Sequence, residues 1–323
     1  MAFLSVVTTV RATSQEDFRY DVYKSNGTAY IEKYIGSSAV VDVPSSIRAD
    51  SGDRDDDGNP IYRNYTVTCI SKYAFSGNVG ITQVSIPETI TDGSKLCIFA
   101  ECTNLREVNF KGVVRDIPTG MFSKCSNLRT LDLKWDSVES IGSGAFQDCG
   151  YDFGVLDYLP NVKTIGARAF GNVQTLTSVS LSSLTRIERE AFIGCGNLES
   201  ASVDGAGLRL EGGGENDYYT YGPFARCPKL RTVRLGDGVV SIPYRLFYGS
   251  TNLETVVLGR GITVANTVLR DLKNLTTVVA RGAIRVIPTG MFSGCSNLRT
   301  LDLKWDSVES IGSGAFQDCG YDF

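Results

Sequence analysis

A short acidic segment near residue 55 has the spacing of a calcium-binding loop. It reads D-R-D-D-D-G-N and fits the pattern D-x-D-x-D-G, in which alternate carboxylates converge on a hard cation and glycine permits a sharp bend. The twelfth position, a bidentate glutamate in an EF-hand, is Asn64 here. The segment is therefore either a calcium site or an acidic, solvent-exposed hairpin tip. The calcium ligands would be Asp53, Asp55, Asp57 and Asn59.

Seven of the nine cysteines stand three residues after a recurring apolar anchor, which is nearly always phenylalanine. A zinc site would require cysteines in C-x-x-C pairs, and the chain has none. Cysteines stacked in parallel point the same way, which is incompatible with the dihedral angle of a disulfide. We expect buried, reduced thiols with a structural role. These cysteines are Cys102, Cys125, Cys149, Cys195, Cys227, Cys295 and Cys319.

The rest of the composition argues against catalysis. Histidine is absent from the 323-residue chain, which removes the commonest general base and metal ligand. The sequence shows no nucleophile–base pair, phosphate-binding loop or acid–base carboxylate pair. Its net charge of −4 lacks the basic stripe that nucleic acids require, and no apolar run is long enough to cross a bilayer. We predict a non-enzymatic protein with no nucleic-acid partner, no membrane insertion within this chain and, apart from possible calcium, no cofactor.

The cysteines belong to a repeat whose anchors are separated by 22 to 24 residues, with one exception of 32. A period in this range is typical of solenoids, in which each coil buries its apolar face against its neighbours. The eleven anchors are Phe75, Phe99, Phe122, Phe146, Phe170, Phe192, Phe224, Phe247, Leu269, Phe292 and Phe316.

Each repeat combines a strand signal, a turn and the anchor segment. From Leu128 to Leu133 the pattern L-x-x-L-x-L predicts a half-buried strand. Gly142 then marks a turn, and the segment from Phe146 to Cys149 is too short for an independent helix. We predict that it forms one helical turn that inserts the phenylalanine into the coil.

These motifs resemble the BspA-like leucine-rich repeats, found in surface proteins of oral and gut bacteria and of some protozoa. The resemblance covers about residues 61–323, and the segment from Thr28 to Ser37 is similar to the β-hairpin cap that often opens such arrays. It implies a mostly β, right-handed solenoid of about eleven coils, with short parallel strands, single helical turns and an N-terminal β-hairpin cap. We expect residues 1–60 to form the N-terminal segment and cap, and residues 61–323 to form the solenoid.

One block of the array is duplicated. Residues 117–153 recur as 287–323, with Lys124 replaced by Gly294 as the only difference. Because further repeats follow the first copy, we expect a longer parent protein to continue beyond Phe323. Each copy holds a lysine–tryptophan pair just after a strand, which is either a contact point for a partner or a cover for the edge of its own coil. These residues are Lys134, Trp135, Lys304 and Trp305.

The one long spacing, from Phe192 to Phe224, contains an insertion at residues 205–221. Insertions in repeat proteins form loops on one face, and tyrosines provide contact area at low entropic cost. The loop is either a binding element or a flexible segment whose tyrosines lie back on the rod. Its candidate contact residues are Tyr218, Tyr219 and Tyr221.

Together with the resemblance, these features predict a cell-surface or secreted adhesion protein that binds a protein or glycan on a host or cell surface. The alternatives are an accessory targeting module of a larger enzyme and a cytoplasmic interaction scaffold, which free cysteines would favour. The apolar stretch from Ala2 to Val10 is either the remnant of a secretory signal or a first strand. The sequence does not indicate an oligomeric state.

Overall fold

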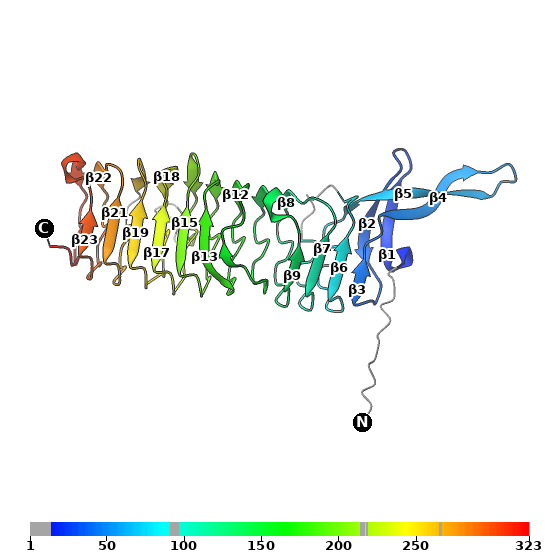
Figure 1. The fold of residues 1–323 in the computed structure, drawn as a ribbon, viewed down its shortest axis with the longest axis horizontal. Coiled ribbons are helices and arrows are strands. Elements are labelled where there is room, and N and C mark those ends of the chain that lie inside the picture. The colour runs from blue at the N-terminus through cyan, green and yellow to red at the C-terminus, as the bar shows by residue number, and fades with distance from the viewer. Residues whose placement is uncertain (1–13, 91–96, 214–216, 218, 265–266, 323) are drawn as a thin grey trace, which may run out of the picture.

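The computed structural model describes residues 14–90, 97–213, 217, 219–264 and 267–322, and shows a rod of stacked strands (Figure 1). The stretch from Ala2 to Val10 and Tyr218 lie outside the described residues. The described part contains three short 3₁₀ helices and no α-helix: η1 (Gln15–Asp17), η2 (Trp135–Ser137) and η3 (Trp305–Ser307). None of these helices has the length and apolarity needed to span a membrane.

A four-stranded sheet lies at the N-terminal end of the rod, and its β4–β5 hairpin projects outward (Figure 1). Its strands are β1 (Phe18–Tyr23), β2 (Thr28–Tyr34), β5 (Pro60–Ile70) and β4 (Ser46–Arg54), in that order. Two antiparallel hairpins, β1–β2 and β4–β5, join through parallel pairing of β2 with β5. The division into 1–60 and 61–323 stays a prediction. In the structure, β5 pairs with strands that precede residue 60, so this sheet contains residues from both sides of the expected boundary.

The N-terminal sheet extends the core of the rod. The ring of Tyr34 stacks on Phe75 at 5.6 Å between ring centroids, and Phe18 meets the same ring edge-on at 6.4 Å. The backbone N–H of Tyr34 also donates to the carbonyl of Ala74 at 3.0 Å. These contacts cover the first coil, whose aromatic face would otherwise be open to water.

Parallel strands form a first ladder along the rod, interrupted once between β9 and β11. In register, β-branched and aliphatic residues align, as in the pairing of Val233 with Val256 and of Val256 with Val278. Each such residue is buried, so the ladder forms a continuous apolar spine. The strands are β3 (Val40–Asp42), β6 (Gln83–Ile86), β7 (Glu107–Phe110), β9 (Thr130–Asp132), β11 (Gly154–Leu156), β13 (Leu176–Leu181), β15 (Ser200–Val203), β17 (Thr232–Leu235), β19 (Thr255–Leu258), β21 (Thr277–Ala280) and β23 (Thr300–Asp302).

A second ladder of shorter strands runs beside the first. Nine turns of the described chain, from β7–β8 to β23–β24, carry a strand in both ladders. The mostly β, parallel solenoid is thus confirmed, with about nine complete turns instead of the eleven coils expected. The second strands are β8 (Asp116–Ile117), β10 (Ser140–Ile141), β12 (Thr164–Ile165), β14 (Arg186–Ile187), β16 (Leu208–Leu210), β18 (Val239–Ile242), β20 (Thr263–Val264), β22 (Val286–Ile287) and β24 (Ser310–Ile311).

Nine of the ten anchor phenylalanines are buried inside the rod, and Phe316, in the last coil, is partly buried. Successive rings lie nearly parallel, with centroids 5.4 Å apart for Phe122 and Phe146 and 5.2 Å apart for Phe170 and Phe192. Both pairs are fully buried. The prediction that the anchors share one core is confirmed, and dispersion between stacked rings adds to the area they bury.

The anchor segments are not helical, which corrects the prediction of a single helical turn. Around Phe122, the residues two before and two after, Gly120 and Lys124, have φ of +64° and +60°. Along the segment, successive backbone N–H groups alternate between two acceptors, a carbonyl of the next coil and a carbonyl three residues earlier in the same coil. The N–H of Phe122 donates to Ala145 of the next coil at 2.8 Å, whereas that of Cys125 donates to Phe122 at 3.1 Å. A helix would satisfy its own carbonyls and leave the edge of the next coil unbonded.

Five of the seven repeat cysteines bond to the neighbouring coil through their thiols, namely Cys102, Cys125, Cys195, Cys227 and Cys295. The Sγ of Cys125 donates to the carbonyl of Phe99 at 3.1 Å, and Ser250, which takes the same position, donates through Oγ to Phe224 at 2.8 Å. The seven repeat cysteines are free thiols, and six of them are buried. Burial raises the pKa of Cys102 to about 12, so these thiols resist ionisation.

Candidate binding surface

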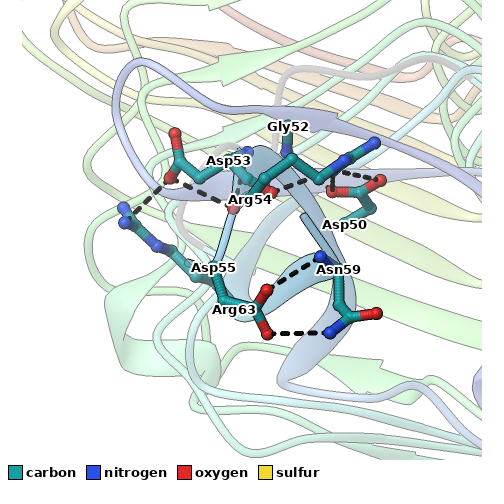
Figure 2. A network of polar contacts seen from close by, with 8 residues as sticks. Asp50, Gly52, Asp53, Arg54, Asp55, Asn59 and Arg63 are labelled. Atoms are coloured by element: carbon teal, nitrogen blue, oxygen red, sulfur yellow. Dashed lines mark hydrogen bonds and ion pairs between the residues drawn. The ribbon is translucent and has the colours of Figure 1, made fainter. Parts of the chain in front are cut away.

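The acidic hairpin tip divides its carboxylates among separate partners. Asp55 accepts hydrogen bonds from the backbone N–H groups of Asp57 and Asn59 at 3.0 and 2.8 Å, and those from Asn59 hold the pKa of Asp55 below its usual value. Asp53 forms an ion pair with Arg63 at 2.9 Å. Figure 2 shows the contacts of Asp55 with Asn59 and of Asp53 with Arg63, together with the Asp50–Arg54 pair.

In the described chain, no three Asp, Glu, Cys or His side chains are grouped as a metal ion requires. Calcium binding by Asp53, Asp55, Asp57 and Asn59 stays a prediction. Calorimetric titration with calcium tests it, with Asp55→Asn as the control variant. Binding heat that this variant abolishes would establish a site, whereas a flat titration at millimolar calcium would leave an acidic tip ordered by its own hydrogen bonds.

Trp135 lies in an aromatic cluster where the first ladder is interrupted. Its ring is half-buried, 5.6 Å from Tyr158, 6.1 Å from Tyr151 and 6.3 Å from Phe153 between centroids. Large side chains therefore occupy the space between β9 and β11 in place of strand pairing. The preceding Lys134 is exposed. This placement gives Trp135 a packing role within its coil, and contact with a partner stays a prediction.

The second copy places the same residues in a similar local setting. Trp305 is half-buried, 6.3 Å from Tyr321 and 6.5 Å from Phe316 between ring centroids, and Lys304 is exposed. The two lysine–tryptophan pairs lie in separate coils, β9–β10 and β23–β24, and the structure does not bring them together. A partner that bound both pairs would have to extend along most of the rod.

The insertion is fastened to the rod through a buried carboxylate. Glu190 is only 4% exposed; one of its oxygens accepts the backbone N–H of Tyr221 at 3.3 Å, and the other pairs with Arg168. Asp217 accepts the backbone N–H groups of Tyr219 and Thr220, both at 3.1 Å. These hydrogen bonds attach the described part of the loop to the rod and leave Tyr219 89% exposed.

Tyr221 belongs to a cluster of stacked tyrosines and arginines, which we call the Tyr–Arg cluster. Its ring stacks on Tyr248 with centroids 5.0 Å apart. The guanidinium of Arg226 lies 4.7 Å from the centre of the Tyr221 ring and donates to its hydroxyl at 3.1 Å. Arg245 lies 5.4 Å from Tyr248 and 5.7 Å from Tyr244. Planar cations on aromatic faces are fixed in orientation at little entropic cost.

On the other side of the loop lies a hollow of about 540 Å³, which we call the polar hollow. Its walls come from the anchor segments of three coils and from the loop itself. Hydroxyl, amide and charged groups predominate, and Tyr219 is the single aromatic side chain in its lining. The hollow is lined by Ser143, Gly144, Gln147, Ala167, Arg168, Arg189, Glu190, Tyr219 and Thr220.

An apolar pocket of about 600 Å³ lies nearer the N-terminal end, beside β6, β7 and β8. Ile86, Ile98, Phe110 and Val114 contribute to its lining. No function is assigned to this pocket.

The arginines of the Tyr–Arg cluster were not singled out in the sequence, although a signal for them exists. Arg245 stands two residues before the anchor Phe247, and Arg226 stands two after the anchor Phe224. Both positions take positive φ in most coils, where glycine is favoured and a bulky residue is uncommon. Non-glycine residues at these two positions lie along the edge of the rod that the anchor segments form. Aligning them over successive repeats would therefore have shown which side chains share that edge.

The repeat and the fold define a leucine-rich-repeat protein. The family model of the BspA type leucine-rich repeat region matches six copies, over residues 59–153, 155–209 and 220–322. The chain belongs to this family, as its motifs predicted. The stretch between the last two matches, residues 210–219, coincides with most of the tyrosine-containing insertion, so the insertion departs from the family's common repeat.

Several solved structures are similar to this chain, and one of them shares its fold. A leucine-rich repeat protein from Bacteroides ovatus is 23% identical over 94% of this chain and 80% of its own, with a TM-score of 0.60. A leucine-rich cell surface protein from Faecalibacterium prausnitzii is 20% identical, over 92% and 97%, with a TM-score of 0.35. The pneumococcal vaccine antigen PcpA is 16% identical, over 97% and 88%, with a TM-score of 0.40. The first likeness supports the fold alone. No curated protein matches the chain.

Proposed function

We propose that this chain is a non-enzymatic binding protein that acts outside the cell or on its surface, by adhesion to a protein or glycan of a host or another cell. Membership of a repeat family with extended surfaces supports a role in binding. The observation that carries the proposal is the insertion: a loop that departs from the family repeat, is fastened through buried Glu190 and presents Tyr219 to solvent. An exposed aromatic side chain on an attached loop is typical of contact surfaces.

A binding screen tests this proposal. The purified chain would be presented to a panel of extracellular matrix proteins and glycans, alongside a Tyr219→Ala variant and a Tyr62→Ala control variant. Tyr62 is also an exposed tyrosine, but it lies on the β4–β5 hairpin, away from the insertion. Binding that Tyr219→Ala weakens and Tyr62→Ala leaves unchanged supports the proposal. Absence of binding across the panel would contradict it.

In the accessory-module alternative, the rod binds through the same surface but acts as a targeting module of a larger enzyme. A hydrolase domain in the full-length gene would favour it. The cytoplasmic-scaffold alternative draws on the free thiols of the seven repeat cysteines, which a reducing compartment would preserve. Surface labelling of intact cells with an antibody separates it from the extracellular proposal, since a scaffold would be labelled only after the cells are opened.

A further inference from the structure

Three asparagines of the chain stand in the motif N-x-[ST] with x other than proline, which is the acceptor motif for N-linked glycans in secreted proteins. They are Asn26, Asn64 and Asn274. The motif also arises by chance, so it does not by itself distinguish the three. The folded chain does distinguish them, through the hydrogen bonds of the side-chain nitrogen Nδ2, the atom to which the sugar is attached.

Asn274 is the asparagine of the repeat, and its amide stabilises the stack of coils. Its Nδ2 donates to the carbonyl of Thr251 at 3.1 Å and to Oδ1 of Asn252 at 3.0 Å, both in the preceding coil. Both hydrogens of this nitrogen are therefore in use, and a glycan would remove one of the two bonds. Asparagines at the same repeat position bond to the preceding coil in the same way, namely Asn104, Asn127, Asn197 and Asn252.

Asn26 lies outside the repeat, in the turn between β1 and β2. Its Oδ1 accepts hydrogen bonds from the backbone N–H and the hydroxyl of Thr28, at 3.2 and 2.8 Å. The side chain is exposed, and its Nδ2 has no hydrogen-bond acceptor among the described residues. A Cβ placed on Gly27 would meet no atom within 4 Å, so the space beside the turn is open. A glycan on Nδ2 would therefore keep both hydrogen bonds and extend into solvent.

Asn64 lies on β5, beside this turn. Thr28 and Thr66, the hydroxyl residues of the two motifs, are paired in register, and the N–H of Thr66 donates to the carbonyl of Gly27 at 3.0 Å. Asn64 is exposed, and within the part of the chain that the structure describes its side chain makes no hydrogen bond. The two motifs thus adjoin in the N-terminal sheet, at the end of the rod, whereas the insertion follows β15 (Figure 1). Glycans here would leave the insertion uncovered.

We propose that Asn26 and Asn64 are N-glycosylated and that Asn274 is not. A glycosyltransferase would move an oligosaccharide from a lipid diphosphate donor to the asparagine. The bond between Nδ2 and the sugar C1 forms, the bond between C1 and the diphosphate oxygen breaks, and the lipid diphosphate leaves with the electron pair while a base of the transferase takes the amide proton. This proposal rests on the extracellular function proposed above, because such glycans are added to secreted proteins.

Peptide mass spectrometry of the protein isolated from its own cells tests the proposal, because trypsin places each motif on a separate peptide. These peptides are 25–33, 64–72 and 274–281. We expect the first two to carry an oligosaccharide that peptide N-glycosidase removes, with conversion of the asparagine to aspartate, and the third to carry none. An unmodified Asn26 or Asn64, or a glycan on Asn274, would overturn the proposal.

Variants produced in the same cells assign each glycan to its residue. Asn26→Gln and Asn64→Gln should each remove one glycan, seen as one step of mobility in gel electrophoresis, whereas Asn274→Gln is the matched control and should remove none. Thr28→Ala should abolish the glycan on Asn26, and Thr28→Ser should retain it. Native circular dichroism would show that each variant is folded. Equal mobility of all the variants would contradict the proposal.

Antibody labelling of the intact cells separates this proposal from the wider function. Protein on the surface with all three peptides unmodified would overturn glycosylation and leave the adhesion proposal in place. Protein that is labelled only after the cells are opened, with the same three peptides unmodified, would remove both proposals.

Discussion

The duplicated block provides a matched pair of isoleucines for testing how stacking stabilises the rod. Ile141 and Ile311 stand in identical local sequences, in β10 and β24. Ile141 pairs on both sides, with β8 and β12, and is 1% exposed. Ile311 pairs with β22 alone and is 52% exposed. Any difference between the two substitutions to alanine therefore comes from neighbouring coils and not from local propensity.

The expected magnitudes follow from burial. Truncating a fully buried isoleucine to alanine removes its transfer free energy and leaves a cavity, and costs about 2–5 kcal/mol. Ile311 is half exposed and borders no closed cavity, so its truncation should cost about 1 kcal/mol or less. We expect Ile141→Ala to lower the free energy of unfolding by about 3 kcal/mol and Ile311→Ala to lower it by less than half of that.

The two tryptophans make the assay local. Trp135 and Trp305 report on the first and second copy, so each substitution is made in a background that keeps only the reporter of its own copy, with the other tryptophan changed to phenylalanine. Urea unfolding followed by tryptophan fluorescence then gives the free energy for each region. Equal losses at the two positions would refute the argument, because they would mean that stacking on a second neighbour contributes nothing measurable.

Four further predictions follow. Gly142→Ala should lower the free energy of unfolding by about 2 kcal/mol or more in urea titrations, because the new Cβ would lie 2.5 Å from the backbone N of Thr119; Gly80→Ala, which meets only a flexible side-chain oxygen at 3.3 Å, should cost less. Lys124→Gly should change it by no more than about 0.5 kcal/mol, since relief at φ +60° offsets the exposed ion pair with Glu101, whereas Lys124→Val should cost more than 1 kcal/mol. The free energy of unfolding should be constant between about pH 6 and 8 and fall as the pH rises toward 12, because burial raises the pKa of Cys102 from 9.0 to about 12 and the unfolded chain ionises first; a flat profile on the alkaline side would contradict this. Iodoacetamide at pH 8 should label Cys102 in the native protein far more slowly than in urea, as mass spectrometry would show.

Much of the fold could be predicted from the sequence, because burial repeats with the period of the coil. The anchor phenylalanines and strand residues such as Val233 and Val256 share a core position in every repeat, and the structure stacks them as expected. The conformation of the anchor segment could not be predicted in this way. The spacing of apolar residues indicates which side chains are buried, but it carries no information on the backbone angle φ. The residue type of Lys124 does not indicate that its backbone lies in the left-handed region.

Of the residues in the candidate site, only the tyrosines were predicted from the sequence. Tyr219 and Tyr221 could be identified in the sequence because they lie in the insertion that interrupts the repeat. In the structure both lie beside residues of the anchor segments. Arg226 and Arg245 are 19 positions apart in the sequence and come together only because stacking places their coils side by side. Glu190 had no signal at all, since its role depends on contact with a loop 31 residues away.

Hydrogen–deuterium exchange of the anchor-segment amides tests the central claim, that each coil is completed by the next. The N–H groups of Phe122, Phe146 and Phe170 donate across coils at 2.8 Å, and the rings beneath them exclude water. We predict that these amides stay protected for hours in native buffer and lose protection together when Ile141→Ala loosens the stack. Exchange within seconds in the native protein would contradict the account, because isolated turns without neighbours exchange at that rate.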